Sequence, residues 1–448
     1  MTKEIRKNYW KTIIFTFCFG WVVIWIYRSM LTPVYGEIQG TIGEQSNAAM
    51  GLIASCYFFG YTALQIPSGF LVDRFGQKRV LIPGFILFAI GAFSIATAQN
   101  LAAIYVGSVL GGVGCGTYYG AAFSLTAQHV PPAKKGLCTA IVNSGSALGM
   151  ILGMTGSSFI VKQLNLPWQV MVCVSASLIV VLVIWFAIAV KDNLAEKKAL
   201  IQAGKEGAPK QEPVQPANAT GSDNTHKQVP EKTEGTAAAT AVGGASLFSA
   251  RLVSCYFLYF TTCYAYYLIV TWLPRFLESE RGITGGMIGL VVSMIAVTAV
   301  PGALFFAHLS DRKRNKKPLI ISGLELSAFV LIAISMFVPN AGLLALVLLL
   351  YGFLGKMAVD PVLISYVSDT ADQRNTAKTL GVFNFFGMSS SIVAPAVTGL
   401  IIDKTGSGQL GFYIGAALLI VGTVTFLALN ARSMRQAAAA AAATTAVK

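Results

Sequence analysis

The sequence predicts an all-helical membrane protein whose twelve transmembrane helices form two pseudo-symmetric six-helix bundles. Three observations carry this prediction: twelve long apolar runs, one polar stretch between the sixth and seventh runs, and matching motifs in the two halves. Of the 448 residues, 55% are hydrophobic and only 12% are charged, and the mean hydropathy is +0.65. Soluble domains are about 25% charged. The composition therefore excludes an ordinary soluble enzyme, a disordered protein and a disulfide scaffold.

Each apolar run is long enough to cross a hydrocarbon core of about 30 Å as a helix that rises about 1.5 Å per residue. In lipid only a helix satisfies all of its own backbone groups over such a length. The runs lie at residues 11–34, 48–71, 79–98, 101–127, 136–162, 167–190, 250–274, 285–307, 318–338, 341–366, 377–402 and 409–430.

The stretch between the sixth and seventh runs is rich in Ala, Gly, Pro, Thr, Lys and Glu and has no apolar period. Such a segment cannot bury a core, so we expect it to be disordered. The predicted organisation is an N-terminal six-helix bundle (1–190), a cytoplasmic linker (191–249), a C-terminal six-helix bundle (250–432) and a cytoplasmic tail (433–448).

The distribution of Lys and Arg predicts the orientation. With twelve spans both chain ends lie on one side, and that side carries 27 of the basic residues against 4 on the other. Without the long linker the ratio is still 19 to 4. The positive-inside rule therefore places the termini and the linker in the cytoplasm of a multi-pass protein of the plasma or inner membrane.

The two halves share short motifs at nearly constant offsets. The segment that begins at Asp73-Arg74 matches the one that begins at Asp311-Arg312, 238 residues later, and Asn143 matches Asn384 at an offset of 241. Gly111-x-x-Gly114 likewise matches Gly352-x-x-Gly355. Homologous six-helix halves are typical of secondary transporters, which hold the substrate between the halves near the membrane midplane.

Residues 69–79 read Gly-Phe-Leu-Val-Asp-Arg-Phe-Gly-Gln-Lys-Arg and join the second and third runs. This loop resembles the signature loop of the major facilitator superfamily. The resemblance implies that Asp73, Arg74, Asp311 and Arg312 form a cytoplasmic latch that breaks and re-forms between two access states. The alternative is a basic loop that only sets the topology and contains one solvated acid.

Residues 60–69 in the second run and Thr271-Trp272-Leu273-Pro274 in the seventh resemble the anion:cation symporter branch of that superfamily, as do residues 394–399 in the eleventh run and Tyr27-Arg28 in the first. Members of this branch move organic anions such as sugar acids. By this resemblance Arg28 occupies the position of an Arg that holds substrate carboxylate, and Tyr61 matches a tyrosine on the substrate side.

Charged side chains inside spans are costly and mark function by default. Arg28 offers a planar fork of donors that fits a carboxylate. The alternative is a structural Arg paired with an acid such as Glu37. Lys356 and Asp360 are four residues apart and can reach each other on one helix face. They form either a neutral pair that holds the helix to a neighbour or a substrate-facing pair.

Asn143 and Asn384 are further candidates for the cavity wall. Many relatives in the branch have an acid where this chain has Tyr27, and another where it has Cys115. The resemblance links both acids to proton coupling, so the route of coupling is open. Asp360 is the first candidate for a coupling site and Glu325 the second, and Glu325 is expected near the membrane interface. Anion exchange is the alternative to ion coupling.

We therefore expect a monomeric secondary active transporter for a small organic anion, a carboxylate or a sugar acid. The alternative is a carrier of the same fold for a neutral sugar or a drug-like solute. The sequence has no metal-ligand cluster, no nucleophile beside a base and no phosphate-binding loop. It predicts no enzyme activity, no cofactor, no metal and no nucleic-acid partner. The predicted partners are the anion, a coupling ion such as a proton, and the lipid bilayer.

Overall fold

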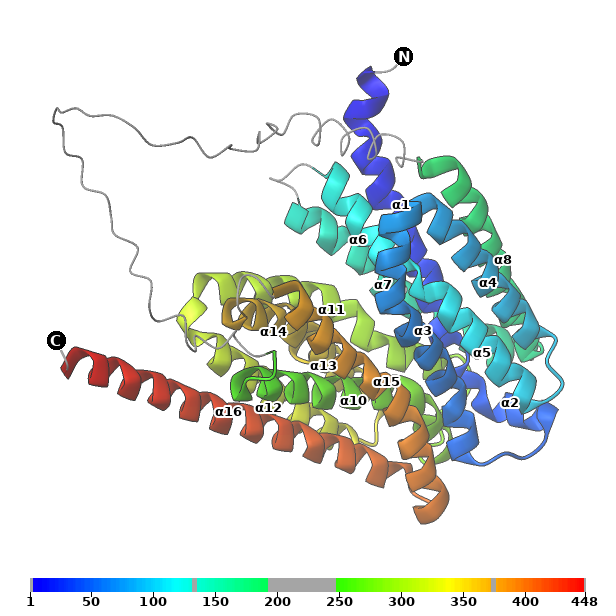
Figure 1. Cartoon of the computed structure of the whole chain (residues 1–448). Helices are drawn as coiled ribbons and strands as arrows, with labels where there is room; N and C mark the ends of the chain where they lie inside the picture. Colours follow the sequence, from blue (N-terminus) through cyan, green and yellow to red (C-terminus); the bar gives the residue numbers. More distant parts are fainter. Residues whose placement is uncertain (1–2, 131–134, 192–246, 372–375, 447–448) are drawn as a thin grey trace. The chain divides into compact units, whose positions relative to one another are not determined.

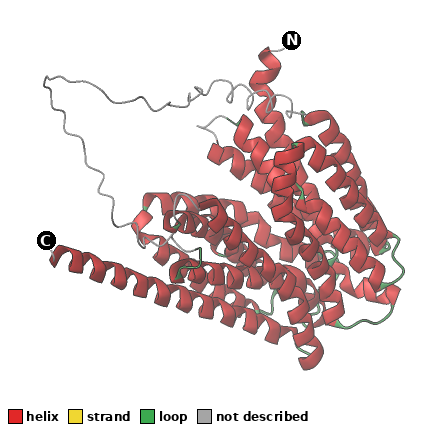
Figure 2. Cartoon of the chain, viewed as in Figure 1, coloured by secondary structure: helices red, strands yellow, loops and turns green. Residues whose placement is uncertain are grey.

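A computed structural model describes residues 3–130, 135–191, 247–371 and 376–446 (Figure 1). Every regular element in these residues is a helix, as Figure 2 shows. Nearly all of the predicted linker lies outside the described residues, so its disorder stays a prediction. The bounds of the elements in the N-terminal half are α1 (Lys3–Met30), η1 (Thr32–Val34), α2 (Tyr35–Ile42), α3 (Asn47–Phe75), α4 (Gln77–Ala96), α5 (Leu101–Gly116), α6 (Tyr118–His129), α7 (Lys135–Ser157), η3 (Ser158–Gln163) and α8 (Trp168–Ala189).

The C-terminal half repeats this order. Its elements are α10 (Ala250–Ser279), α11 (Met287–Arg312), η4 (Arg314–Lys316), α12 (Lys317–Ser335), α13 (Ala341–Leu354), α14 (Lys356–Thr370), α15 (Thr376–Thr405) and α16 (Gly408–Ala446). The helix α16 continues through the Ala-rich stretch that the sequence predicts only as a tail. Ala has the highest helix propensity of all residues, which explains the extension.

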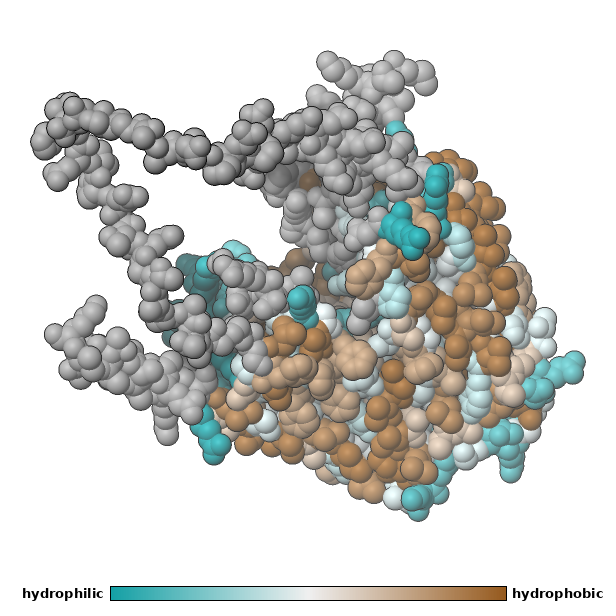
Figure 3. All heavy atoms as spheres, in the orientation of Figure 1, coloured by the Kyte–Doolittle hydropathy of each residue, from teal (hydrophilic) through white to brown (hydrophobic). Residues whose placement is uncertain are grey.

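The twelve predicted spans are confirmed. Eleven helical segments of the described chain are long and apolar enough to cross a membrane. The helix α3 is the twelfth span, because its 29 residues include no charged side chain before Asp73 in the last turn. Hydrophobic side chains cover most of the coloured surface in Figure 3, and hydrophilic ones gather at its edges. This distribution fits helices that face lipid.

Side-chain caps fix where several spans begin. The Ser46 hydroxyl accepts the backbone N–H of Ala49 at the start of α3, and the Asn100 side chain accepts that of Ala103 at the start of α5. Ser249 and Asn340 cap α10 and α13 in the same way. These caps satisfy amides that a helix N-terminus leaves without partners.

The fourth and tenth spans are interrupted at corresponding places. The fourth divides into α5 and α6 at Thr117, and the tenth into α13 and α14 at Gly355, whose backbone is extended (φ −91°, ψ −150°). The interruption places Lys356 at the first residue of α14. Interrupted spans in matching positions of two halves point to the substrate region of a transporter.

Two helix pairs join the halves: α3 packs against α15, and α7 packs against α11 (Figure 1). Glycines permit the close approach. Gly51 faces the Pro395 carbonyl and Gly399 faces the Asn47 carbonyl, and a Cβ at either position would collide with that backbone. We use "far face" for the membrane side where α1 ends and α3 begins, and "near face" for the side that carries both chain ends.

Candidate functional site

Arg28 lies near the end of α1, partly buried among aromatic rings. Its guanidinium carbon is 4.4 Å from the ring centroid of Tyr61, and four more centroids lie within 5.8 Å. Those rings belong to Trp21, Trp25, Tyr57 and Phe58. Rings at these distances stabilise a cation through their electron-rich faces.

Two polar atoms also touch the guanidinium. Its Nε donates to the Tyr57 hydroxyl at 3.0 Å, and one Nη lies 3.9 Å from the Cys115 sulfur. No acidic side chain within the described ranges pairs with Arg28. Glu37, the acid considered as its structural partner, instead accepts a hydrogen bond from Lys162 at 2.7 Å. Among the described side chains, no carboxylate balances the charge of Arg28.

Lys356, in contrast to Arg28, is paired with an acid. Its Nζ donates to Oδ2 of Asp360 at 2.5 Å, one turn along α14. The Lys356 side chain is nearly buried, and its Nζ lies 5.4 Å from the ring centroid of Tyr266 and 5.7 Å from that of Tyr259. The second carboxylate oxygen of Asp360 has no hydrogen-bond partner among the residues described.

A chain of rings connects the two cations. Phe58, which contacts Arg28, lies 4.7 Å from Tyr267 between ring centroids, and Tyr267 lies 5.4 Å from Tyr266, which contacts Lys356. The halves thus meet through an aromatic wall with one cation on each side. Together Arg28, Lys356 and Asp360 leave one net positive charge.

A cavity of about 320 Å³ lies beside this wall, toward the near face. It is lined by both halves through Thr62, Gln65, Tyr119, Tyr259, Ile364, Leu380, Gly381, Phe383, Asn384 and Phe385. Inside it the Asn384 amide donates to the Gln65 side-chain oxygen at 3.1 Å, a bond that crosses between the halves.

Only some of the predicted site residues line this cavity. Asn384 lines it, while Tyr61 is buried beneath Arg28. Asn143 is exposed and is not among the lining residues. Asn143 lies seven residues before Met150, so the two residues share one helix face. Met150 contacts Tyr266 of the other half. Sequence reasoning missed Gln65 and Tyr259. Gln65 was detectable as a polar side chain one turn beyond Tyr61.

Glu325 is deep inside the C-terminal bundle, with no exposed surface. This burial does not fix its depth in the membrane, so the expected position near the membrane interface stays a prediction. One carboxyl oxygen contacts the Thr262 hydroxyl, and the other has no hydrogen-bond partner in the described part of the chain. Neighbouring helices bury this side chain, since α12 packs against α13, α14 and α16, and Thr262 belongs to α10.

The near-face residues of the predicted latch have few contacts. Arg74, Asp311 and Arg312 are exposed, and no ion pair between described side chains joins them to the other half. Asp73 lies in the last turn of α3, but its side chain lies outside the described residues. The cytoplasmic latch therefore stays a prediction.

The far face instead carries polar contacts between the halves that the sequence did not predict. Asp403, near the end of α15, accepts the backbone N–H groups of Asn47 and Ala48 at 2.7 and 2.8 Å, and also the Asn47 side-chain amide at 2.8 Å. A carboxylate at a helix N-terminus is stabilised by the free amides and the helix dipole. We name these three bonds the far-face clasp.

Two further polar contacts join the halves on the same side. Lys162, which also pairs with Glu37 of its own half, contacts Glu278. Arg275 donates to the Gln39 side chain at 2.8 Å. The candidate site is therefore separated from the far face, while the cavity lies on its near-face side.

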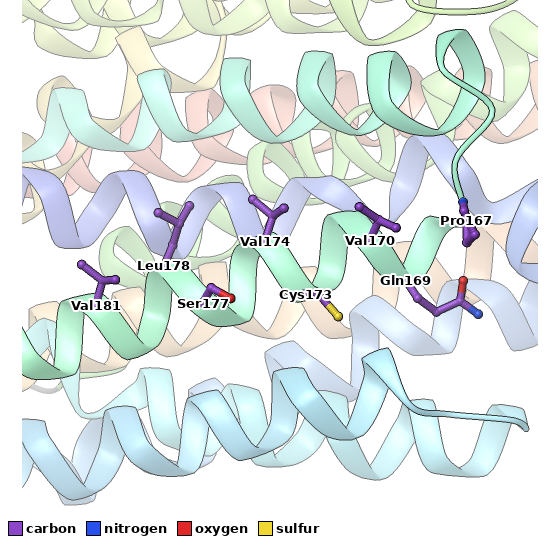
Figure 4. A pocket seen from close by; sticks show the side chains of 8 residues that line it. All are labelled: Pro167, Gln169, Val170, Cys173, Val174, Ser177, Leu178 and Val181. Atoms are coloured by element: carbon purple, nitrogen blue, oxygen red, sulfur yellow. The ribbon is translucent and has the colours of Figure 1, made fainter.

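A second hollow, of about 740 Å³, lies on the surface of α8 (Figure 4). Figure 4 shows its lining side chains, among them Val174, Leu178 and Val181, along one helix. It contains no charged residue. We assign it to the lipid-facing surface. No group of three or more His, Cys, Asp or Glu in the described residues is arranged to hold a metal ion.

The chain aligns with known transporters over most of its length and most of theirs. The chain is 26% identical to the hexuronate transporter of Bacillus subtilis (strain 168), over 94% of each protein. It is 26% identical to the D-galactonate transporter of Escherichia coli O6:H1, over 91% of this chain and 92% of that protein. It is also 26% identical to the 3-(3-hydroxy-phenyl)propionate transporter of Escherichia coli K12, over 86% of each.

Among solved structures, a bacterial homolog of the human lysosomal transporter Spinster, in an inward-facing and occupied conformation, superposes with a TM-score of 0.69. It covers 95% of this chain and 96% of its own at 13% identity, which establishes the fold alone. The sequence profile of the Major Facilitator Superfamily matches residues 12–395 and 255–447. With two six-helix bundles, matched interruptions and this coverage, the chain belongs to the Major Facilitator Superfamily, whose members are membrane transporters rather than enzymes.

Proposed function

We propose that this transporter moves a small organic anion across the membrane and that Arg28 binds the anion's carboxylate. One observation carries the proposal: the guanidinium lies where the two halves meet and has no acidic partner among the described residues. A partly buried cation without a counter-ion is costly, and a substrate carboxylate relieves that cost. A neutral sugar would leave the charge unbalanced, so the anion is the better cargo.

The relatives support the same substrate class. Their names specify a hexuronate, D-galactonate and an aryl-substituted propionate. These molecules share a carboxylate and differ in the rest of the skeleton. A guanidinium surrounded by flat rings fits that shared group, since Arg pairs with carboxylates through two parallel hydrogen bonds.

Alternating access follows from the arrangement of contacts. The far-face clasp holds α3 against α15, and the cavity lies on the near side of the aromatic wall. We propose that the near face is cytoplasmic, as the distribution of basic residues favours. Opening to the outside then requires the clasp to break while Asp73, Arg74, Asp311 and Arg312 close the near face.

Coupling is proposed to involve a proton on a buried carboxyl group. Glu325 and Asp360 each have one carboxyl oxygen without a hydrogen-bond partner among the described residues. The test uses Glu325→Gln and Asp360→Asn in proteoliposomes under an imposed pH gradient. A proton-binding residue is one whose variant equilibrates substrate but no longer concentrates it. If both variants concentrate substrate as the wild type does, anion exchange replaces proton coupling.

The anion proposal is tested by binding and uptake. Arg28→Gln should lose binding of D-galactonate, or of whichever carboxylate the wild type binds, by at least about 100-fold, because a charge-assisted bidentate contact disappears. Lys404→Gln is the matched control, since it removes an exposed far-face cation. Equal uptake by wild type and Arg28→Gln would refute the proposed site.

A further inference from the structure

We infer that the transporter selects monocarboxylates over dicarboxylates, and that Asp360 is the residue that sets this preference. The inference rests on the proposed function, because it assumes that a carboxylate binds at Arg28. It adds a selection rule: the protein carries its own second carboxylate in the place where that of a dicarboxylate would bind.

The charges beside the aromatic wall lead to this rule. Two cations lie there, but they are not equally available. Arg28 has a hydroxyl and a thiol as polar neighbours, whereas Lys356 is bound by Asp360 at 2.5 Å. Arg28, Lys356 and Asp360 together carry one net positive charge, and it belongs to Arg28. A monoanion brings the sum to zero, while a dianion brings it to minus one.

Asp360 forms its contact at little cost. It lies four residues after Lys356 on the same helix, so the two side chains meet without any movement of the backbone. A second substrate carboxylate would have to displace it and leave two carboxylates around one ammonium. In a site with little water, unpaired or repelling charges cost several kcal/mol. Repulsion of the wrong ligand is a common source of specificity.

The free oxygen of Asp360 has a further effect. It has no hydrogen-bond partner among the described residues. It can therefore accept a hydrogen bond from a hydroxyl group at the far end of a substrate. An aldonic acid has a hydroxyl at that end, whereas the aldaric acid of the same skeleton has a second carboxylate. The same atom thus attracts the first and repels the second.

The test compares acids that differ only in the second carboxylate. D-galactonate and galactarate form one pair, and benzoate and phthalate form another. Dissociation constants are measured on the purified full-length protein in detergent by calorimetry. We expect the wild type to bind the monoacid of at least one pair at least tenfold more tightly than its diacid.

Asp360→Asn frees Lys356 while keeping the shape of the side chain. We expect it to shift the ratio of dissociation constants at least tenfold toward the diacid. The double variant Lys356→Met with Asp360→Asn removes both charges and should return the preference to the monoacid. It is the matched control, and it also carries the test if Asp360→Asn alone does not fold.

Each outcome decides something. A wild type that binds monoacid and diacid within threefold of each other overturns the inference, as does an unchanged ratio in a folded Asp360→Asn. A double variant that favours the diacid overturns it too. Loss of both acids in Arg28→Gln supports the proposed anion site independently of selectivity. A wild type that binds none of the four acids overturns the inference, whereas the proposed function is decided by the uptake of other carboxylates in wild type and Arg28→Gln.

Discussion

Arg28, which is partly buried, and Lys356, which is buried, are two cations on opposite sides of one aromatic wall, and their surroundings differ. In the N-terminal half five rings surround the guanidinium and no described acid touches it. In the C-terminal half an acid one turn away neutralises the ammonium. Under the proposed function, the cation of the N-terminal half attracts the anion, and the ion pair of the C-terminal half limits which anion fits.

The chemistry of the two side chains explains the division. A guanidinium is weakly hydrated and stacks on rings, so aromatic walls can hold it without a counter-ion. An ammonium is a compact and strongly hydrated charge, so it needs an acid when it is removed from water. An acid beside Arg28 would cancel the attraction for substrate. The neutral side chains of Tyr27, next to Arg28 in the sequence, and Cys115, 3.9 Å from its guanidinium, are consistent with the proposed attraction.

The largest expected effect is on stability and comes from breaking the pair. Lys356→Met leaves Asp360 without a cation, which should lower the free energy of unfolding by about 3 kcal/mol. Adding Asp360→Asn should recover most of that loss, because no uncompensated charge remains. Thermal unfolding in detergent measures both. A single variant as stable as the double would mean that water already solvates Asp360.

The second effect separates charge from geometry at Arg28. Arg28→Lys keeps the positive charge but loses the planar fork and the stacking on Tyr61. We expect substrate affinity to fall about tenfold to thirtyfold, between the wild type and Arg28→Gln. Calorimetry with D-galactonate or benzoate gives the value. An affinity equal to that of the wild type would show that charge alone recruits the anion.

The sequence predicted the twelve spans and identified Arg28, Lys356 and Asp360 as candidate site residues, because charged residues inside apolar runs can be found without a structure. It did not predict which cation is paired. An i,i+4 spacing permits the Lys356–Asp360 contact, but the set of described side chains around Arg28, which includes no acid, depends on how α1, α3 and α5 pack. The burial of Glu325 likewise depends on the neighbours of α12.

The far-face clasp was also beyond sequence reasoning. Asp403 and Asn47 are 356 residues apart, and their contact exists only because α15 ends where α3 begins. The internal repeat and the signature pattern both lie in the near-face loops, so the sequence predicted contacts there. A single Asp at a helix end has no comparable pattern, since its partners are backbone amides of a distant helix.

The third effect concerns access to both cations. Asp403→Ala removes three hydrogen bonds at the start of α3 and should shift the equilibrium toward far-face opening by about 1 kcal/mol. Ser55 lies between the aromatic wall and the far face, and its hydroxyl donates to the Ile392 carbonyl of the other half at 2.6 Å. In a background without the seven native cysteines, labelling of Ser55→Cys by an impermeant maleimide should become about fivefold faster.

Lys404→Gln is the control for that experiment, because it changes the neighbouring exposed charge and leaves the clasp in place. It should label at the wild-type rate. If Asp403→Ala labels no faster than this control, the remaining bonds of Lys162 and Arg275 are sufficient to hold the far face closed. The clasp would then be a helix cap without influence on access.

The smallest expected effect tests how firmly Arg28 is oriented. Tyr57→Phe keeps the ring beside the guanidinium but removes the hydroxyl that accepts from Nε at 3.0 Å. One such hydrogen bond contributes about 1 kcal/mol, so monocarboxylate affinity should fall about fivefold, with the preference over dicarboxylates unchanged. Calorimetry with the paired acids measures both quantities. An altered preference would mean that Tyr57 also acts on the second carboxylate, and the separation of roles between the two halves would fail at that residue.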